Sequence, residues 1–224
     1  MADPTYQPTD RRPIAARRLV VFQKLAKALA HRGVSANAIS IAGMISALVA
    51  GAALAATSCA STTWWLFLLA AAGVQLRLLA NMIDGMVAIE SGKASRVGEI
   101  YNEAPDRVSD IAVLVGAGYA AGGQIELGYL AAILAVMTAY IRAIGKAAGA
   151  ANEFCGPMAK QQRMFIVTIS AIYLALTPTS WQPTFAWRGA SCGLLAIALI
   201  VIIVGCIATT IRRLARIMRA LRMK

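Results

Sequence analysis

The stretch NMIDGMVAIESGKASRVGEIYNEAPDRVSD, residues 81–110, carries most of the acidic residues of the chain and lies between long apolar runs. The whole chain of 224 residues is 59% hydrophobic and only 14% charged. Soluble domains average about half apolar and about a quarter charged residues. This excess of apolar residues indicates a bilayer as the solvent, where a spanning helix needs about 20 mainly apolar residues.

Apolar runs of transmembrane length stand on both sides of this stretch. We expect six spans, at residues 38–57, 63–83, 107–122, 125–148, 163–178 and 187–211. A basic amphipathic helix within residues 14–32 precedes them and suits the membrane interface. The sequence therefore predicts an all-α, polytopic membrane protein with six transmembrane helices plus an N-terminal amphipathic interfacial helix. Residues 1–13 are expected to form a polar tail, and residues 14–224 a single membrane-embedded domain.

The net charge of +12 is distributed unevenly along the chain. Lys and Arg cluster at both termini and in two segments, 89–106 and 146–163, while the other turns are almost free of them. Because positive residues stay cytoplasmic, this pattern places both termini and the acidic stretch on the cytoplasmic side. It favours contact with anionic phospholipids over nucleic acid, which we do not expect as a partner. The four cysteines stand singly, which argues against zinc and a disulfide framework.

Oxygen-bearing side chains recur at helical spacing within the acidic stretch. Asn81 and Asp84 are three residues apart, and Asn102, Asp106 and Asp110 follow at intervals of four. Such spacings stack side chains on one helix face, and oxygen clusters with substrate phosphates suit Mg²⁺. A cytoplasmic loop flanked by ordinary polar residues is the alternative. Against it stands the glycine after Asp84, which costs about 1 kcal/mol in a helix and makes sense where a nucleotide approaches the backbone.

The stretch resembles the signature of the CDP-alcohol phosphotransferase family, D-x2-D-G-x2-A-R-x8-G-x3-D-x3-D. Five positions match: Asp84, Gly85, Ala88, Gly98 and Asp106. Three positions depart from it, because Asn81 and Asn102 replace aspartates and Ile89 replaces the arginine. Arg142 also matches an arginine of the family's fourth span.

The resemblance implies a metal site and a catalytic base. In the family, the four aspartates hold two divalent ions, and the last aspartate is the proposed general base. Carried over, Asp106 is the catalytic residue, and one or two Mg²⁺ or Mn²⁺ ions would be held by Asp84, Asp106, Asn81 and Asn102. With only two carboxylates at these positions, the missing negative charge has to come from the substrate pyrophosphate or from Asp110, Glu103 or Glu99. Otherwise a single ion binds, or none.

The same resemblance implies the substrate contacts. A nucleotide would lie over Asp84, Gly85, Ala88 and Gly98, with Lys93 or Arg96 in place of the missing arginine. Phosphate groups would meet Arg142, Lys160 and Arg163, for which lipid headgroups and topology are the alternative explanation. Pro105 indicates that the third span begins near residue 104 or is kinked there.

The implied activity belongs to phospholipid biosynthesis. It is the transfer of a phosphatidyl group from CDP-diacylglycerol to a small polar alcohol or its phosphate, with release of CMP. The expected enzyme is a homodimer in a bacterial inner membrane with its active site facing the cytoplasm. Two alternatives remain open: a CDP-amino-alcohol:diacylglycerol phosphotransferase, and a non-catalytic lipid- or nucleotide-binding protein with a degenerate metal site.

Overall fold

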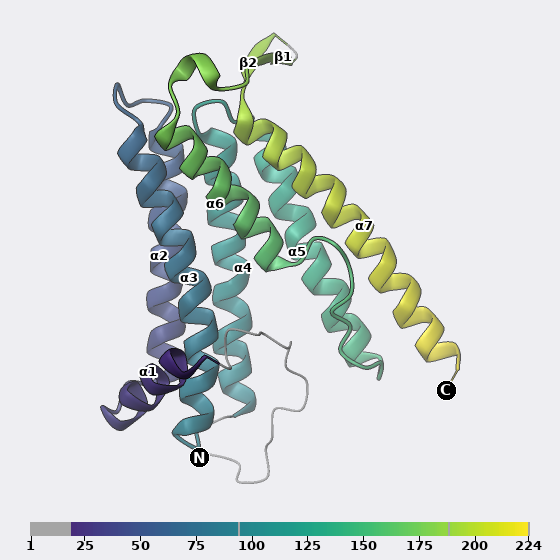
Figure 1. Cartoon of the computed structure of the whole chain (residues 1–224). Coiled ribbons are helices and arrows are strands. Elements are labelled where there is room, and N and C mark those ends of the chain that lie inside the picture. Colours follow the sequence, from purple (N-terminus) through teal and green to yellow (C-terminus); the bar gives the residue numbers. More distant parts are fainter. Residues whose placement is uncertain (1–18, 94, 188, 224) are drawn as a thin grey trace. The chain divides into compact units, whose positions relative to one another are not determined.

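The computed structural model describes residues 19–93, 95–187 and 189–223, and the described chain is mostly helical (Figure 1). The helices are α1 (Val20–His31), α2 (Ala36–Ala56), α3 (Trp64–Glu90), α4 (Arg96–Tyr119), α5 (Ile125–Ala147), α6 (Lys160–Leu176) and α7 (Leu194–Arg222). Ser35 caps α2, because its Oγ accepts a hydrogen bond from Ala38 N at 3.1 Å. The predicted polar tail lies outside the described residues.

Four of these helices, α2, α3, α5 and α7, are long and apolar enough to cross a membrane. The chain is therefore a mostly helical membrane protein. Helices α4 and α6 occupy the places of the predicted third and fifth spans but are not among those four. The number of six spans stays a prediction.

A short β-hairpin corrects the all-α expectation. Strands β1 (Phe185–Trp187) and β2 (Ala190–Cys192) pair antiparallel, with Trp187 opposite Ala190. Gly189 adopts a φ of +82° in the turn, a conformation that glycine reaches without steric cost. Because the hairpin occupies these residues, α7 begins at Leu194 and not at residue 187.

The start of α4 also differs from the prediction. The helix begins at Arg96, because Ser95 Oγ accepts a hydrogen bond from Gly98 N at 3.1 Å and so caps its first turn. Pro105 lies inside the helix rather than in its first turn. Asn102 is consequently well inside α4 and not at its entry.

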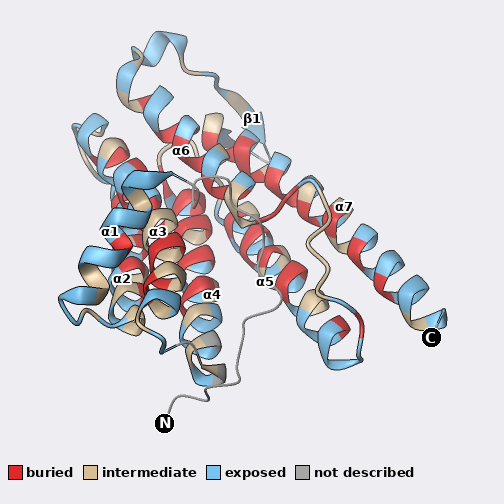
Figure 2. Cartoon of the chain, turned by 60° about the horizontal axis from the view of Figure 1, so that its bottom comes forward, coloured by how far each residue is buried: buried red, intermediate tan, exposed pale blue. Residues whose placement is uncertain are grey.

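The chain forms two compact units, whose boundaries fall within α2, α3 and α4. Unit 1 comprises the described part of Met1–Ser46 together with Leu76–Ser109. In unit 1, Ala26 of α1 forms a buried cluster with Met82, Ile83 and Val87 of α3. The opposite side of α1 is exposed, as the blue surface of this helix in Figure 2 shows.

Unit 2 comprises Ala47–Gln75 and Asp110–Lys224, and here α5 and α7 pack along each other. Small residues bring α2 and α4 into backbone contact, since a Cβ atom on Gly51 would lie 2.3 Å from the carbonyl oxygen of Ala112. Gly116 faces Gly51 in the same way, and Gly118 faces Gly128 of α5. The small-residue run of α4 is thus used for packing within this unit, and the homodimer stays a prediction.

A buried arginine of α7 joins three segments of unit 2. Arg213 is 5% exposed. Its Nε donates to Cys155 O at 2.9 Å, and its Nη1 donates to Thr138 O of α5 at 2.7 Å. One side chain therefore fixes the last helix to α5 and to the loop before α6.

Candidate active site

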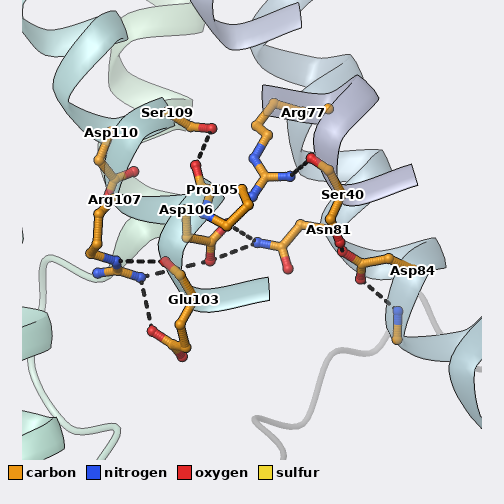
Figure 3. Close-up of polar contacts among 12 residues, drawn as sticks. Ser40, Arg77, Asn81, Asp84, Glu103, Pro105, Asp106, Arg107, Ser109 and Asp110 are labelled. Atoms are coloured by element: carbon orange, nitrogen blue, oxygen red, sulfur yellow. Dashed lines mark hydrogen bonds and ion pairs between the residues drawn. The ribbon is translucent and has the colours of Figure 1, made fainter. Parts of the chain in front are cut away.

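Unit 1 brings side chains of three helices into one buried polar network, drawn in Figure 3. Helix α3 contributes Arg77, Asn81 and Asp84, which follow one another at roughly one helical turn. Helix α4 contributes Asp106, and α2 contributes Ser40. The two motif carboxylates that the sequence singles out thus belong to one network.

Asp106 is 8% exposed and is surrounded by nitrogen donors. Asn81 Nδ2 donates to both of its oxygens, at 2.7 and 2.9 Å. Arg77 Nη2 forms an ion pair with Oδ1, and Arg107 Nη2 lies 3.7 Å from Oδ2. Asn81 therefore acts as a hydrogen-bond donor to this carboxylate through its amide nitrogen, a contact that the sequence analysis did not include.

Asp84 is 2% exposed and is held from two sides. Ser40 Oγ donates to Oδ2 at 2.5 Å, and the backbone N of Gly85 donates to Oδ1 at 2.5 Å. The carbonyl of Ser40 also accepts a hydrogen bond from Arg77 Nη1 at 3.3 Å. Ser40 thus connects the surroundings of Asp84 with the Arg77–Asp106 ion pair.

Arg77 is a site residue that the sequence analysis missed. It is 1% exposed, and its guanidinium lies at the centre of the network. The available signal was a charged residue inside the apolar run 63–83, one turn before Asn81, since ionisable residues at membrane depth are costly and usually functional. The sequence analysis interpreted residues 63–83 only as a transmembrane span and did not consider Arg77 separately.

Asn102 of α4 lies close in sequence to Asp106 but differs from it in its contacts. Its Oδ1 is buried and has no hydrogen-bond partner in the described part of the chain. Helices α3 and α4 are consecutive and antiparallel, and Arg77 contacts Asp106. Asn81 lies one turn after Arg77 in α3, and Asn102 lies one turn before Asp106 in α4. In two antiparallel helices these two residues are therefore at about the same level. A buried carbonyl oxygen without a donor is a possible ligand for a cation.

The other predicted residues of unit 1 lie around this network. Ala88 and Gly98 are half-buried, in α3 and in the first turn of α4, and Lys93 is exposed in the loop between the two helices. Glu103 is exposed and forms an ion pair with Arg107 at 3.4 Å. The side chains of Arg96 and Glu99 are outside the described part of the structure.

The predicted phosphate-binding residues belong to unit 2. Arg163 is 2% exposed, and its Nη2 lies 2.5 Å from Oδ2 of Asp110, which is fully buried. This ion pair engages both Asp110, the expected auxiliary acid, and Arg163, the expected phosphate ligand. The guanidinium of Arg142 lies 5.4 Å from the ring centre of Phe154, and Lys160 is the first residue of α6.

No family model matches the chain. It is similar to the inner membrane protein YnbA of Escherichia coli, with 28% identity over 66% of this chain and 72% of that protein. It is also similar to the archaetidylinositol phosphate synthase of Pyrococcus horikoshii, with 27% identity over 69% of this chain and 78% of that enzyme.

Two crystal structures of the phosphatidylinositol phosphate synthase of Mycobacterium tuberculosis share the fold. One has CDP-DAG bound and matches with a TM-score of 0.69, 20% identity and coverage of 89% of this chain and 94% of that chain. The other, a complex with manganese and citrate, matches with a TM-score of 0.69, 20% identity and 88% coverage of both chains. The resemblance to the CDP-alcohol phosphotransferase family is confirmed.

Set against the CDP-alcohol phosphotransferase signature, these residues fit one divalent ion better than two. Among the described residues, no group of three His, Cys, Asp or Glu side chains is placed to hold a metal. The cation Arg77 contacts Asp106, so a dication there would meet a positive charge. In the described part of the chain no cation forms an ion pair with Asp84, and each of its oxygens keeps a second lone pair. The Oδ1 of Asn102 is a further buried oxygen without a hydrogen-bond partner in the described part of the chain.

Proposed function

We propose that the protein is a phospholipid-synthesising CDP-alcohol phosphatidyltransferase. It transfers a phosphatidyl group from CDP-diacylglycerol to the hydroxyl of a small polar alcohol or its phosphate and releases CMP. Two findings on related proteins support this: one relative is named an archaetidylinositol phosphate synthase, and the matching crystal structure carries CDP-DAG. A phosphorylated inositol is accordingly the first acceptor to test.

The observation that carries the proposal is the placement of the two retained motif carboxylates. Asp84 and Asp106 are 22 positions apart in the sequence, at the signature spacing, and both belong to the buried network of unit 1. Both carboxylates are buried and are held in fixed orientation by a serine, an asparagine and an arginine. Polar residues that merely flank a loop would be exposed to solvent. This arrangement supports a chemical role over the alternative of ordinary flanking residues.

In the proposed reaction, the acceptor hydroxyl oxygen attacks the phosphorus of the phosphatidyl group. The bond between this phosphorus and the bridging oxygen of CMP breaks, and CMP leaves with the electron pair. Asp106 takes the hydroxyl proton as general base. Asn81 and Arg77 hold the Asp106 carboxylate in place, since their hydrogen bonds fix both of its oxygens.

One Mg²⁺ or Mn²⁺ ion is part of the proposal, supported by the manganese complex of the related synthase. Asp84 and Asn102 would hold it. Such an ion would neutralise the charge that develops on the pyrophosphate during phosphoryl transfer. The nucleotide would lie over Gly85, where a glycine lets it approach the backbone of α3.

The remaining substrate residues stay predictions. Ala88, Gly98 and Lys93 are proposed to contact the nucleotide, and Arg142 and Lys160 to contact phosphate. Arg163 is assigned to packing in unit 2, because its guanidinium is paired with buried Asp110.

The proposed membrane arrangement has six spans, with α4 and α6 added to the four apolar helices. Helix α6 supports this, because Phe165, Ile169, Ile172 and Leu176 are exposed along its length. Helix α1 is proposed to lie in the interface, where its exposed Val20, Val21 and Leu25 would meet lipid. Both termini and the active site would face the cytoplasm of a bacterial inner membrane, and the enzyme would act as a homodimer.

The proposal is tested by CMP release from the purified protein. CDP-diacylglycerol is supplied with a panel of polar alcohols and their phosphates, in Mg²⁺ or Mn²⁺, and the lipid product is identified by mass spectrometry. Asp106→Ala should abolish CMP release, whereas Glu126→Gln, at an exposed position in the first turn of α5, should not change it. Full turnover by Asp106→Ala would refute the assignment of the base.

The same assay separates the alternatives. CMP release only from CDP-amino-alcohols with diacylglycerol would indicate the reverse arrangement of donor and acceptor. Nucleotide binding without CMP release under any of these conditions would indicate a non-catalytic protein. The Arg77–Asp106 ion pair is the observation that favours this second outcome, because it already neutralises the proposed base.

A further inference from the structure

Arg77 places a permanent positive charge where the family signature leads one to expect metal ions. A guanidinium carries its positive charge on five N–H donors and offers no acceptor. The side chain is 1% exposed, and buried charges are stable only when they are paired. Its partner here is Asp106, the last carboxylate of the signature.

The fold leaves space for this guanidinium at one position of α2. A Cβ atom on Gly43 would lie 2.8 Å from Arg77 Nη1 and 2.6 Å from the Cβ of Ala80. Any larger residue at position 43 would therefore displace the guanidinium or separate α2 from α3. Three features hold the Arg77 guanidinium in one position. They are the absence of a side chain at Gly43, the hydrogen bond to Ser40 O and the ion pair with Asp106.

The charges of the site agree with a single ion. A site with four aspartates carries four negative charges, which two divalent ions balance. In this chain the two asparagines remove two of these charges, and Arg77 offsets a third. Arg107 and Glu103 pair with each other beside Asp106, and their charges cancel. The network of unit 1 is therefore left with a single net negative charge, which one divalent ion already exceeds.

We infer that Arg77 takes over, within the chain, the charge of the second metal ion, so that the active site binds one divalent ion and holds Asp106 through an arginine. Arg77 is a positioning residue in this scheme, because it acts on Asp106 and not on the reacting atoms. The inference rests on the proposed function, since it concerns the ion that this reaction uses.

The test is the number of Mn²⁺ ions bound by the purified protein in a neutral detergent. Free Mn²⁺ is measured by electron paramagnetic resonance during titration, with CDP present to supply a pyrophosphate. The natural sequence should bind one ion per chain. Asp84→Asn should weaken this binding at least about tenfold, whereas Glu126→Gln, outside the site, should leave it unchanged.

A variant that restores the signature gives the opposite expectation. The triple change Arg77→Met, Asn81→Asp and Asn102→Asp returns four carboxylates without the arginine, and it should bind two ions per chain. Arg77→Lys retains the positive charge and should bind one. A second ion in the natural sequence with an affinity within about tenfold of the first would overturn the inference, and this measurement needs no variant to fold.

The inference and the proposed function fail in different ways. If the natural protein releases CMP while binding two ions, the function stands and the role of Arg77 is refuted. If it binds one ion and releases no CMP with any donor, the charge assignment stands and the proposed reaction is refuted.

Discussion

The ion pair of Asp110 and Arg163 in unit 2 allows a test of the role of Arg163. This residue either stabilises the packing of unit 2 or binds substrate. Both side chains are buried, and Arg163 Nη1 also donates to Met158 O at 3.1 Å. Removing one partner leaves the other charge buried and unpaired. This typically destabilises a protein by about 3–5 kcal/mol.

The perturbation is Arg163→Met, which keeps much of the side-chain volume and removes the charge. In chains of this length about 1 kcal/mol lowers the melting temperature by about 2–4 °C, so we expect a decrease of about 6–20 °C. Asp110→Leu should give a similar loss. The double change should recover most of it, because apolar residues often replace a buried ion pair at little or no cost.

The assay is thermal unfolding in detergent, followed by intrinsic tryptophan fluorescence for the natural sequence, both single variants and the double variant. CMP release is measured on each variant at a temperature where it is folded. A melting temperature within about 2 °C of the natural sequence for Arg163→Met, together with a raised KM for CDP-diacylglycerol, would refute the packing role. Arg163 would then be the phosphate ligand that the sequence first indicated.

Three further predictions concern other parts of the chain. Ser40→Ala removes a hydrogen bond to the charged Asp84, a bond of about 1.5–3 kcal/mol, and should lower CMP release about tenfold to a hundredfold. Gly51→Ala forces a methyl group against the backbone of α4 and should destabilise the fold by about 3 kcal/mol. Burial raises the pKa of the Cys155 thiol and the Glu153 carboxylate adds to this, so its thiolate fraction is low at neutral pH and iodoacetamide alkylation should need a higher pH than for an ordinary thiol. Glu153→Gln should move this alkylation profile to lower pH.

Each of these predictions has a matched control. Ser40→Thr keeps the hydroxyl and should retain more activity than the alanine variant; equal activities would contradict the role of the hydrogen bond. Ala52→Leu changes the exposed neighbour of Gly51 and should leave the melting temperature unchanged. The thiol profile is measured after Cys59→Ser, since Cys59 is the exposed free cysteine and Cys192 and Cys206 are buried. An unchanged profile for Glu153→Gln would contradict the electrostatic contribution.

The parts of the site that depend on spacing along the sequence were predictable. Asp84 and Asp106 follow from the signature, and their burial in one network agrees with the interpretation that they are more than loop residues. Arg77 was not predicted, because its partner is 29 positions away on another helix and only the folded chain brings them together. The pairing of Arg163 with Asp110 was not predicted for the same reason, since the charge of Arg163 is visible in the sequence but its partner on another helix is not.

For the fold, too, some features could be predicted from the sequence and others could not. Apolar runs located the helices, since hydrophobic length is a strong signal for a chain in a bilayer. Their ends depended on single side chains. Pro105 suggested a late start for α4, but the cap provided by Ser95 decided an earlier one. The hairpin at Phe185–Cys192 was missed because strands of three residues leave no periodic pattern that could be distinguished from an apolar run.

The buried Arg213 has a consequence for the order in which the protein is made. Its two acceptors, the carbonyls of Thr138 and Cys155, are synthesised well before α7. Neither carbonyl can bind this guanidinium until α7 has been synthesised. The final arrangement of α5 and the loop before α6 therefore waits for the last helix. A chain that stops short of residue 213 would have α5 in the membrane without the side chain that fixes it.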